Sequence, residues 1–110
     1  MAGTFEKREK GFESKWAHDE ELRFKVFARR NKLLGVWAAG EMGISGSAAD
    51  AYAKEVVAAD FEKPGDDDVF DKVRRDLDAK KIALSDHMLR RKMEELLEEA
   101  KRQVETEVKK

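Results

Sequence analysis

Apolar side chains recur at helical spacing along residues 20–42. More than any other feature of the sequence, this periodicity limits the folds that the chain can adopt. Leu22, Val26, Leu33 and Trp37 are separated by four or seven residues, so they share one face of an α-helix. Such a stripe is typical of a helix packed against a core. Charged residues make up 43% of the chain and hydrophobic ones 41%, so the apolar residues must be confined to narrow faces of this kind. The sequence therefore predicts an all-α fold.

Residues that end or begin helices divide the rest of the chain. Glycines at 40–46 are expected to end the first helix, because glycine readily adopts the left-handed conformation found at helix ends. Pro64 separates the second helix from the third, and Ser85 is placed as the N-cap of the last. The sequence thus predicts a four-helix bundle over residues 20–110 with a mobile N-terminal helical extension over residues 1–19. The four predicted helices cover residues 20–42, 47–62, 66–81 and 86–107.

The extension over residues 1–19 carries three large aromatic side chains and little other apolar surface. Phe5, Phe12 and Trp16 would align on one side of a helix, but the residues between them on that side are charged. Three apolar residues in four turns bury too little surface to hold a helix in place, and Gly11 costs about 1 kcal/mol relative to alanine. We therefore expect this segment to become helical in the groove of a partner. The alternative is that Phe12 and Trp16 fold back onto the bundle as core residues.

The two histidines form no recognisable catalytic or metal-binding pattern. His18 is followed by three carboxylates, but on a helix only Glu21 lies on the same face, and no second histidine follows at i+4. His87 falls in the first turn of the last predicted helix with no nucleophile beside it. The chain has no cysteine, and it carries no motif for a phosphate, dinucleotide or metal cofactor. These patterns favour a protein that is not an enzyme and needs no cofactor.

The charge distribution gives no reason to expect a nucleic-acid partner. The net charge is −1, no apolar stretch is long enough to span a membrane, and no signal-peptide run is present, so the expectation is a cytoplasmic protein. Arg29, Arg30 and Lys32 form a short basic cluster beside the first apolar stripe. Such a cluster is usually a solvated face, and it could also bind an acidic partner surface or a phosphate, which would allow weak nucleotide binding.

Three long segments of the sequence resemble a known protein family. They read FESKWAHDEELRFKVFARRNKLLGVWAA, AYAKEVVAADFEKPGDDDVFDKVRRDL and SDHMLRRKMEELL, and the likeness runs from about Phe5 to Ala100. Together they resemble the zeta subunits of alphaproteobacterial F1Fo-ATP synthases. These are the ATPase inhibitor subunits, a family also catalogued as a domain of unknown function.

The resemblance implies a four-helix fold and a regulatory subunit that inhibits ATP hydrolysis by the F1 motor. In that family the N-terminal segment inserts as a helix at a catalytic interface between the α and β subunits, near the γ shaft, while the bundle docks outside. The implied location is peripheral, on the membrane-bound ATP synthase. A competing hypothesis is a small helical adaptor or nucleotide-binding module without strong inhibitory activity. The residues that the resemblance assigns to partner binding are Phe5, Lys7, Arg8, Lys10, Phe12, Trp16 and His18.

Overall fold

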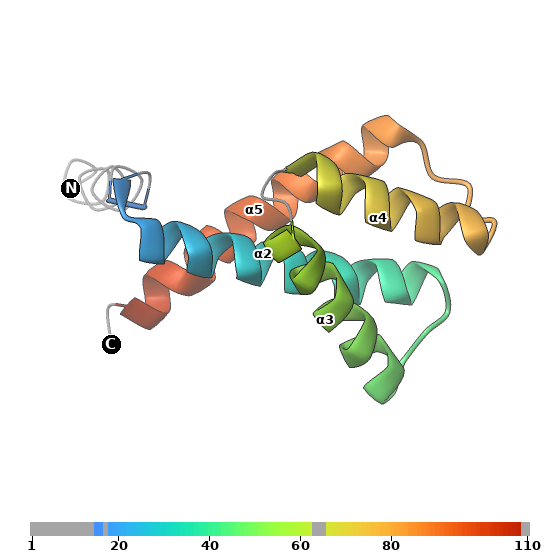
Figure 1. The fold of residues 1–110 in the computed structure, drawn as a ribbon, viewed down its shortest axis with the longest axis horizontal. Coiled ribbons are helices and arrows are strands. Elements are labelled where there is room, and N and C mark those ends of the chain that lie inside the picture. The colour runs from blue at the N-terminus through green and yellow to red at the C-terminus, as the bar shows by residue number, and fades with distance from the viewer. Residues whose placement is uncertain (1–14, 17, 63–65, 109–110) are drawn as a thin grey trace, which may run out of the picture.

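Four α-helices make up most of the described part of the chain (Figure 1). The computed structural model describes residues 15, 16, 18–62 and 66–108, and these residues contain no β-strand. The all-α four-helix bundle predicted from the sequence is confirmed, and each helix begins and ends within two residues of its predicted bounds. The helices are α2 (Glu20–Glu41), α3 (Gly46–Glu62), α4 (Asp66–Ala79) and α5 (Asp86–Val108).

Helices α2 and α5 are the longest, with 22 and 23 residues; they pack together where α2 begins and α5 ends, and in Figure 1 they diverge toward the other end of the molecule. In Figure 1, α3 and α4 lie at one end of this pair, whereas the start of α2 and the end of α5 extend beyond them at the other. The molecule is correspondingly elongated, with extents of 48 × 27 × 26 Å. No helix in the described ranges is both long and apolar enough to cross a bilayer.

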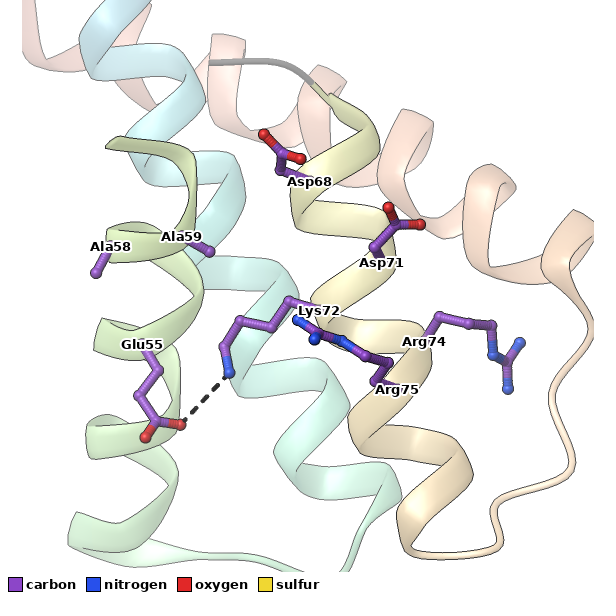
Figure 2. Close-up of a pocket in the computed structure, with 8 residues that line it drawn as sticks. All are labelled: Glu55, Ala58, Ala59, Asp68, Asp71, Lys72, Arg74 and Arg75. Carbon is purple, nitrogen blue, oxygen red and sulfur yellow. Dashed lines mark ion pairs between the residues drawn. The ribbon is translucent and has the colours of Figure 1, made fainter. Parts of the chain in front are cut away.

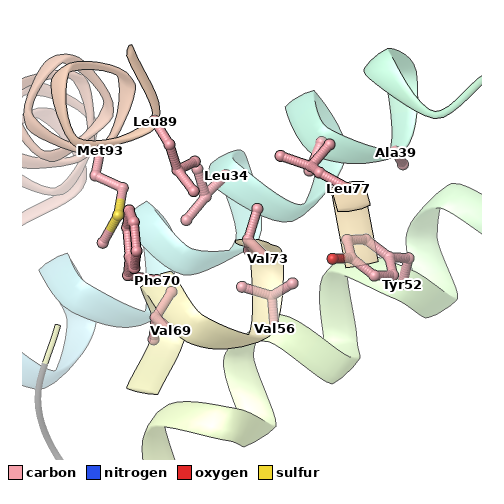
Figure 3. Close-up of a cluster of buried hydrophobic side chains, with 11 residues drawn as sticks. Leu34, Ala39, Tyr52, Val56, Val69, Phe70, Val73, Leu77, Leu89 and Met93 are labelled. Atoms are coloured by element: carbon pink, nitrogen blue, oxygen red, sulfur yellow. The ribbon is translucent and has the colours of Figure 1, made fainter. Parts of the chain in front are cut away.

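The larger hydrophobic core lies where all four helices meet (Figure 3). Each helix contributes one apolar face, so this core fixes the helices relative to one another. Half-buried residues, among them Trp37 and Leu96, pack around it. The buried members of the larger core are Leu34, Ala38, Ala39, Tyr52, Val56, Val69, Phe70, Val73, Leu77, Leu89 and Met93.

A second, smaller core joins the start of α2 to the end of α5. Its buried members are Leu22 and Val26 from α2 and Ala100 and Val104 from α5. We call this part of the molecule the α2–α5 arm. Since two helices cover only part of each other's surface, the arm leaves apolar side chains open on its flanks. Those flanks are covered in part by Trp16, Leu33 and Leu97.

Helices α2 and α3 approach each other very closely at Gly35. A Cβ atom on Gly35 would lie 2.6 Å from the Cα atom of Ala53 and 3.1 Å from its Cβ atom. The first distance is shorter than any normal contact between carbon atoms, so any side chain at residue 35 would push the two helices apart. Glycine at this position is therefore a requirement of the α2–α3 packing.

Helices α2 and α4 end in the same C-terminal motif with different residues at its left-handed position. The backbone N–H groups of Ile44 and Ile82 each donate to the carbonyl five residues earlier, at 2.8 and 2.9 Å. The residue before each isoleucine has a positive φ, which is 75° at Gly43 and 60° at Lys81. Both ends are Schellman motifs, in which glycine is the usual left-handed residue. The glycine-rich stop predicted after α2 is thus found at Gly43, while α4 ends on a lysine.

The start of α5 follows the prediction made from the sequence. The hydroxyl oxygen of Ser85 accepts a hydrogen bond from the backbone N–H of Met88 at 3.2 Å, as an N-cap does. Leu84, just before the cap, and Leu89, in the first turn, both pack into the larger core. This pairing across the cap fixes the direction in which the chain enters α5.

Candidate functional site

The chain bends at Asp19, immediately before α2. The Asp19 side chain accepts a hydrogen bond from the N–H of Leu22 at 3.1 Å, and its backbone is extended, with φ of −104° and ψ of 111°. Asp19 is therefore the N-cap of α2. Glu20 and Glu21 occupy the first turn, where negative charge opposes the positive end of the helix dipole. The three carboxylates that follow His18 thus have a structural explanation as the start of a helix.

Trp16 folds back onto the α2–α5 arm. The centroid of its ring lies 5.9 Å from that of Phe27, with 60° between the ring planes, and Lys101 Nζ lies 4.6 Å from the centroid of the Trp16 ring. In one continuous helix, Trp16 and Phe27 would be about 16 Å apart along the axis. The bend at Asp19 therefore brings them together. Of the two alternatives that the sequence left open for Trp16, the structure contains the contact with the bundle.

The remaining residues of the predicted N-terminal site fall into two groups. His18 is described and exposed, and its predicted role in partner binding stays a prediction. Among the described residues, no group of three or more histidine, cysteine, aspartate and glutamate side chains could hold a metal ion. The other predicted partner-binding residues lie outside the described ranges, so their roles stay predictions; these are Phe5, Lys7, Arg8, Lys10 and Phe12.

Arg30 lies in the interior of the bundle. Its side chain is only 1% exposed, its Nη2 donates to Asp66 Oδ1 at 2.8 Å, and its Nε donates to Asn31 Oδ1 at 2.8 Å. The guanidinium carbon also lies 5.4 Å from the centroid of the Phe27 ring. Arg30 therefore links α2 to α4 from within, where it presents no charge to a ligand or partner.

The other two members of the predicted basic cluster lie in different surroundings. Arg29 Nη1 donates to Gln103 Oε1 at 2.8 Å, and its Nη2 donates to Glu107, so Arg29 links α2 to α5. Lys32 is exposed. The structure thus separates the three cations, and only Lys32 is directed entirely to the surface.

Lys32 lies between two hollows that follow the boundary of α2 and α3. Their volumes are about 530 and 400 Å³, and because both are lined by Lys32 and Val57 we refer to the two hollows together as the α2–α3 groove. Lysines flank it, and small apolar side chains form much of its wall. The first hollow is also lined by Asp50, Ala53, Lys54 and Ala58, and the second by Phe24, Lys25, Ala28, Arg29 and Glu107.

A further hollow of about 790 Å³ lies between α3 and α4 (Figure 2). Its charges are mixed and largely compensated: Lys72 Nζ lies 3.1 Å from Asp76 and 3.8 Å from Glu55. Figure 2 shows Arg74 directed away from Glu55, and Arg74 contacts Asp78 and Asp86 instead. Opposite charges at this spacing give no strong preference for an anion or a cation. We therefore do not assign a ligand to this hollow.

Tyr52 is a buried titratable side chain next to Lys72, which lines this hollow: Lys72 Nζ lies 5.3 Å from the centroid of the Tyr52 ring. Its hydroxyl donates to Asp76 Oδ2 at 2.8 Å. Burial, and then this hydrogen bond and the negative charge of Asp76, raise the pKa of Tyr52 far above its ordinary value. A tyrosine held in its protonated form in this way stabilises the contact between α3 and α4, and it is poorly suited to proton transfer near neutral pH.

Comparison with known proteins gives one family and related solved structures. A family model described as ATPase inhibitor subunit zeta matches residues 1–103, which confirms the resemblance seen in the sequence. The chain is also similar to a protein whose structure was solved in solution by NMR, with 49% sequence identity and a TM-score of 0.69. That similarity covers 78% of this chain and 98% of the other. No curated protein matches the chain.

Proposed function

The chain belongs to the ATPase inhibitor subunit zeta family, and we propose that it inhibits ATP hydrolysis by inserting its N-terminal segment as a helix into F1. The family match supports the coarser statement, an inhibitory regulatory subunit that binds the F1 sector of ATP synthase. The proposed site of insertion is a catalytic interface between the α and β subunits near the γ shaft. The protein would then act in the cytoplasm, peripherally on the membrane-bound synthase, without being an enzyme itself.

The N-cap at Asp19 is the observation that carries this proposal. Because the Asp19 side chain satisfies the N–H of Leu22, α2 begins without help from the residues before Lys15. The bundle can therefore keep its start while the N-terminal segment binds elsewhere. Burial of aromatic side chains and pairing of cations with carboxylates on the motor would offset the cost of ordering that segment. The residues proposed for these contacts are Phe5, Lys7, Arg8, Lys10 and Phe12.

The proposal is tested by measuring ATP hydrolysis by isolated F1 in the presence of the full chain and of a chain lacking residues 1–14. We expect the full chain to inhibit and the shortened chain to lose inhibition. This deletion ends before Trp16 and Asp19, so the cap of α2 and the α2–α5 arm are kept, and circular dichroism should show an unchanged bundle. Equal inhibition by the two chains would show that another part of the protein is responsible.

A single substitution sharpens the same assay. Phe12→Ala removes one of the proposed aromatic contacts, and we expect a higher concentration for half-maximal inhibition. Met88→Ala is the matched control, since it also removes a large apolar side chain, and Met88 is 57% exposed on α5. If both variants weaken inhibition equally, loss of exposed apolar surface in general, and not the N-terminal contact, explains the effect.

The α2–α3 groove favours a second candidate function, a helical adaptor or nucleotide-binding module. Lys32 and Lys54 flank apolar side chains there, an arrangement in which phosphates could meet the lysines and a base the apolar wall. Titration with ATP, followed by NMR, tests this function. Shifts confined to Lys32, Lys54 and Val57 would support it, whereas an unchanged spectrum together with working inhibition would remove it.

A further inference from the structure

We propose that Trp16 is a positioning residue, which holds the base of the N-terminal segment against the α2–α5 arm so that the segment meets its partner in a fixed direction. This inference rests on the function proposed above and adds a role for the bundle in inhibition. Trp16 would act through the orientation of the chain before it, without needing to contact the motor.

The bend that carries Trp16 is hydrogen-bonded on both sides. The N–H of Asp19 donates to the carbonyl of Lys15 at 2.9 Å, and the carbonyl of Asp19 accepts from the N–H of Arg23 at 3.0 Å. The Asp19 carboxylate in addition caps α2 through Leu22. Backbone groups bonded in this way leave the bend little freedom, so it has a defined angle. The direction of the Lys15–Trp16 turn is therefore fixed relative to α2.

The Trp16 side chain joins both helices of the arm. It lies against Phe27 of α2, with 5.9 Å between the two ring centroids. It also lies under the ammonium group of Lys101 of α5, whose Nζ is 4.6 Å from the centroid of the Trp16 ring. Lys101 is itself held in place, since its Nζ lies 3.2 Å from Glu98 and its side chain is 12% exposed. Because the two contacts come from different helices, they restrain the indole in more than one direction.

Hydrophobic packing of the α2–α5 arm is by itself a weak reason for the contact that Trp16 makes with it. The buried centre of the arm is made by Leu22, Val26, Ala100 and Val104, and Trp16 lies half-buried at its edge. Releasing Trp16 would therefore leave the buried centre in place and mainly free the chain that precedes it. A freed segment must be ordered when it binds, whereas a held segment has part of that cost removed in advance. The Trp16 contact should thus lower the concentration needed for inhibition without changing its maximum.

Helix α5 provides a matched control for the Lys101 contact. Lys92 Nζ lies 5.7 Å from the ring centroid of Trp37, and it also pairs with a glutamate three residues away, Glu95, at 3.1 Å. Lys92 and Lys101 therefore lie on the same helix, each over a tryptophan and each beside a carboxylate. Trp37 packs against the larger core, away from the α2–α5 arm. Substituting either lysine with glutamate changes the net charge equally, but only Lys101→Glu disturbs Trp16.

The test is titration of isolated F1 with four full-length proteins: the unmodified chain, Lys101→Glu, Lys101→Arg and Lys92→Glu. Losing an ammonium group from the face of an aromatic ring at an exposed site changes the ratio of held to released ring by about two- to fivefold. A carboxylate in its place is in addition repelled by the negative face of the ring. We expect Lys101→Glu to raise the concentration for half-maximal inhibition about threefold or more, with the same maximum. Lys101→Arg should restore the original value, because a guanidinium also stacks on indole. Lys92→Glu should stay close to the unmodified chain.

Tryptophan fluorescence in a Trp37→Phe background shows directly whether Trp16 has been released. We expect Lys101→Glu to shift the Trp16 emission to the red, with an unchanged helix content. Trp16→Ala provides a second variant, which should weaken inhibition in the same direction if Lys101→Glu proves unstable.

Two outcomes would overturn the positioning role. One is inhibition by Lys101→Glu at the original concentration although Trp16 is released; the other is an equal loss of inhibition in Lys92→Glu. A failure of the proposed function looks different, because the unmodified chain itself would then leave ATP hydrolysis unchanged.

Discussion

The guanidinium of Arg30, buried inside the bundle, is bonded to the carboxylate of Asp66 at the first residue of α4, with 2.8 Å between Nη2 and Oδ1. The two partners lie in very different surroundings, since the Arg30 side chain is 1% exposed and the Asp66 side chain 53%. Water can therefore hydrate the carboxylate, but it does not reach the cation. A buried cation needs a charged partner, so the fold depends on Asp66 more than its position at the surface suggests.

We predict that Asp66→Asn lowers the free energy of unfolding by about 2 kcal/mol, because the buried guanidinium loses its counter-charge. Asp67→Asn is the matched control. Asp67 is the next residue of the same helical turn and also contacts an arginine, Arg90 at 3.0 Å, but that pair is exposed on both sides. Exposed pairs contribute little, so Asp67→Asn should change stability by less than about 1 kcal/mol. Urea denaturation of both variants checks the difference, and equal losses would contradict a special role for Asp66.

The contact at Gly35 gives a prediction about helix packing. In Gly35→Ala the new methyl group would overlap the backbone of Ala53, so α2 and α3 must separate, and we expect a loss of about 1–3 kcal/mol despite the better helix propensity of alanine. Gly40→Ala is the control within the same helix. Apart from its chain neighbours and the backbone of its own helix, no atom of the described residues lies within 4 Å of the Cβ position at Gly40, and alanine there should stabilise the protein by up to about 1 kcal/mol. Thermal unfolding of the two variants should therefore shift in opposite directions.

Helix positions could be predicted from the sequence because each helix carries its own apolar stripe and its own end signals. Ser85 illustrates this, since an N-cap depends only on residues within one turn. Asp19 carried a comparable signal, a capping residue followed by two glutamates, and that signal places the bend before α2. The return of Trp16 onto Phe27 depends on that bend, so helical spacing by itself, which aligned Trp16 with Phe12, did not reveal it.

Contacts between helices were harder to predict from the sequence than the positions of the helices. Arg30 lies four residues after Val26 and seven before Trp37, so helical spacing puts it on the same face as the apolar stripe, although the sequence was interpreted as placing it beside that stripe. The choice of Asp66 as partner was not visible, because it depends on how α4 docks against α2. The same holds for Gly35, whose need for glycine comes entirely from the position of Ala53 on another helix.

The two Schellman motifs predict opposite effects of opposite substitutions. Lys81 adopts a φ of 60°, which costs a residue with a side chain about 1 kcal/mol relative to glycine. Lys81→Gly should therefore raise the free energy of unfolding by up to about 1 kcal/mol. Gly43→Ala, at the equivalent position after α2, should lower it by a similar amount. If Lys81→Gly destabilises the protein, the lysine side chain makes a contribution that outweighs the backbone strain.

Tyr52 predicts how stability depends on alkaline pH. Burial and the hydrogen bond to Asp76 raise the pKa of this hydroxyl in the folded protein, whereas in the unfolded chain it keeps its ordinary value of about 10. Below that value both states hold the proton, and the contribution of Tyr52 to stability is complete. Above it the unfolded chain releases the proton while the folded protein keeps it. The unfolded state then binds fewer protons, so the free energy of unfolding falls as the pH rises.

The expected size of this fall is about 1.4 kcal/mol per pH unit once the pH exceeds 10. Lysines also titrate in this range, so the comparison is with Tyr52→Phe, in which the tyrosine contribution is absent and the slope should be smaller by that amount. Because the chain contains one tyrosine, absorbance of the phenolate reports its ionisation directly. We expect this absorbance to appear only as the protein unfolds. Ionisation of Tyr52 near pH 10 in a folded protein would show that the contact with Asp76 does not hold the proton.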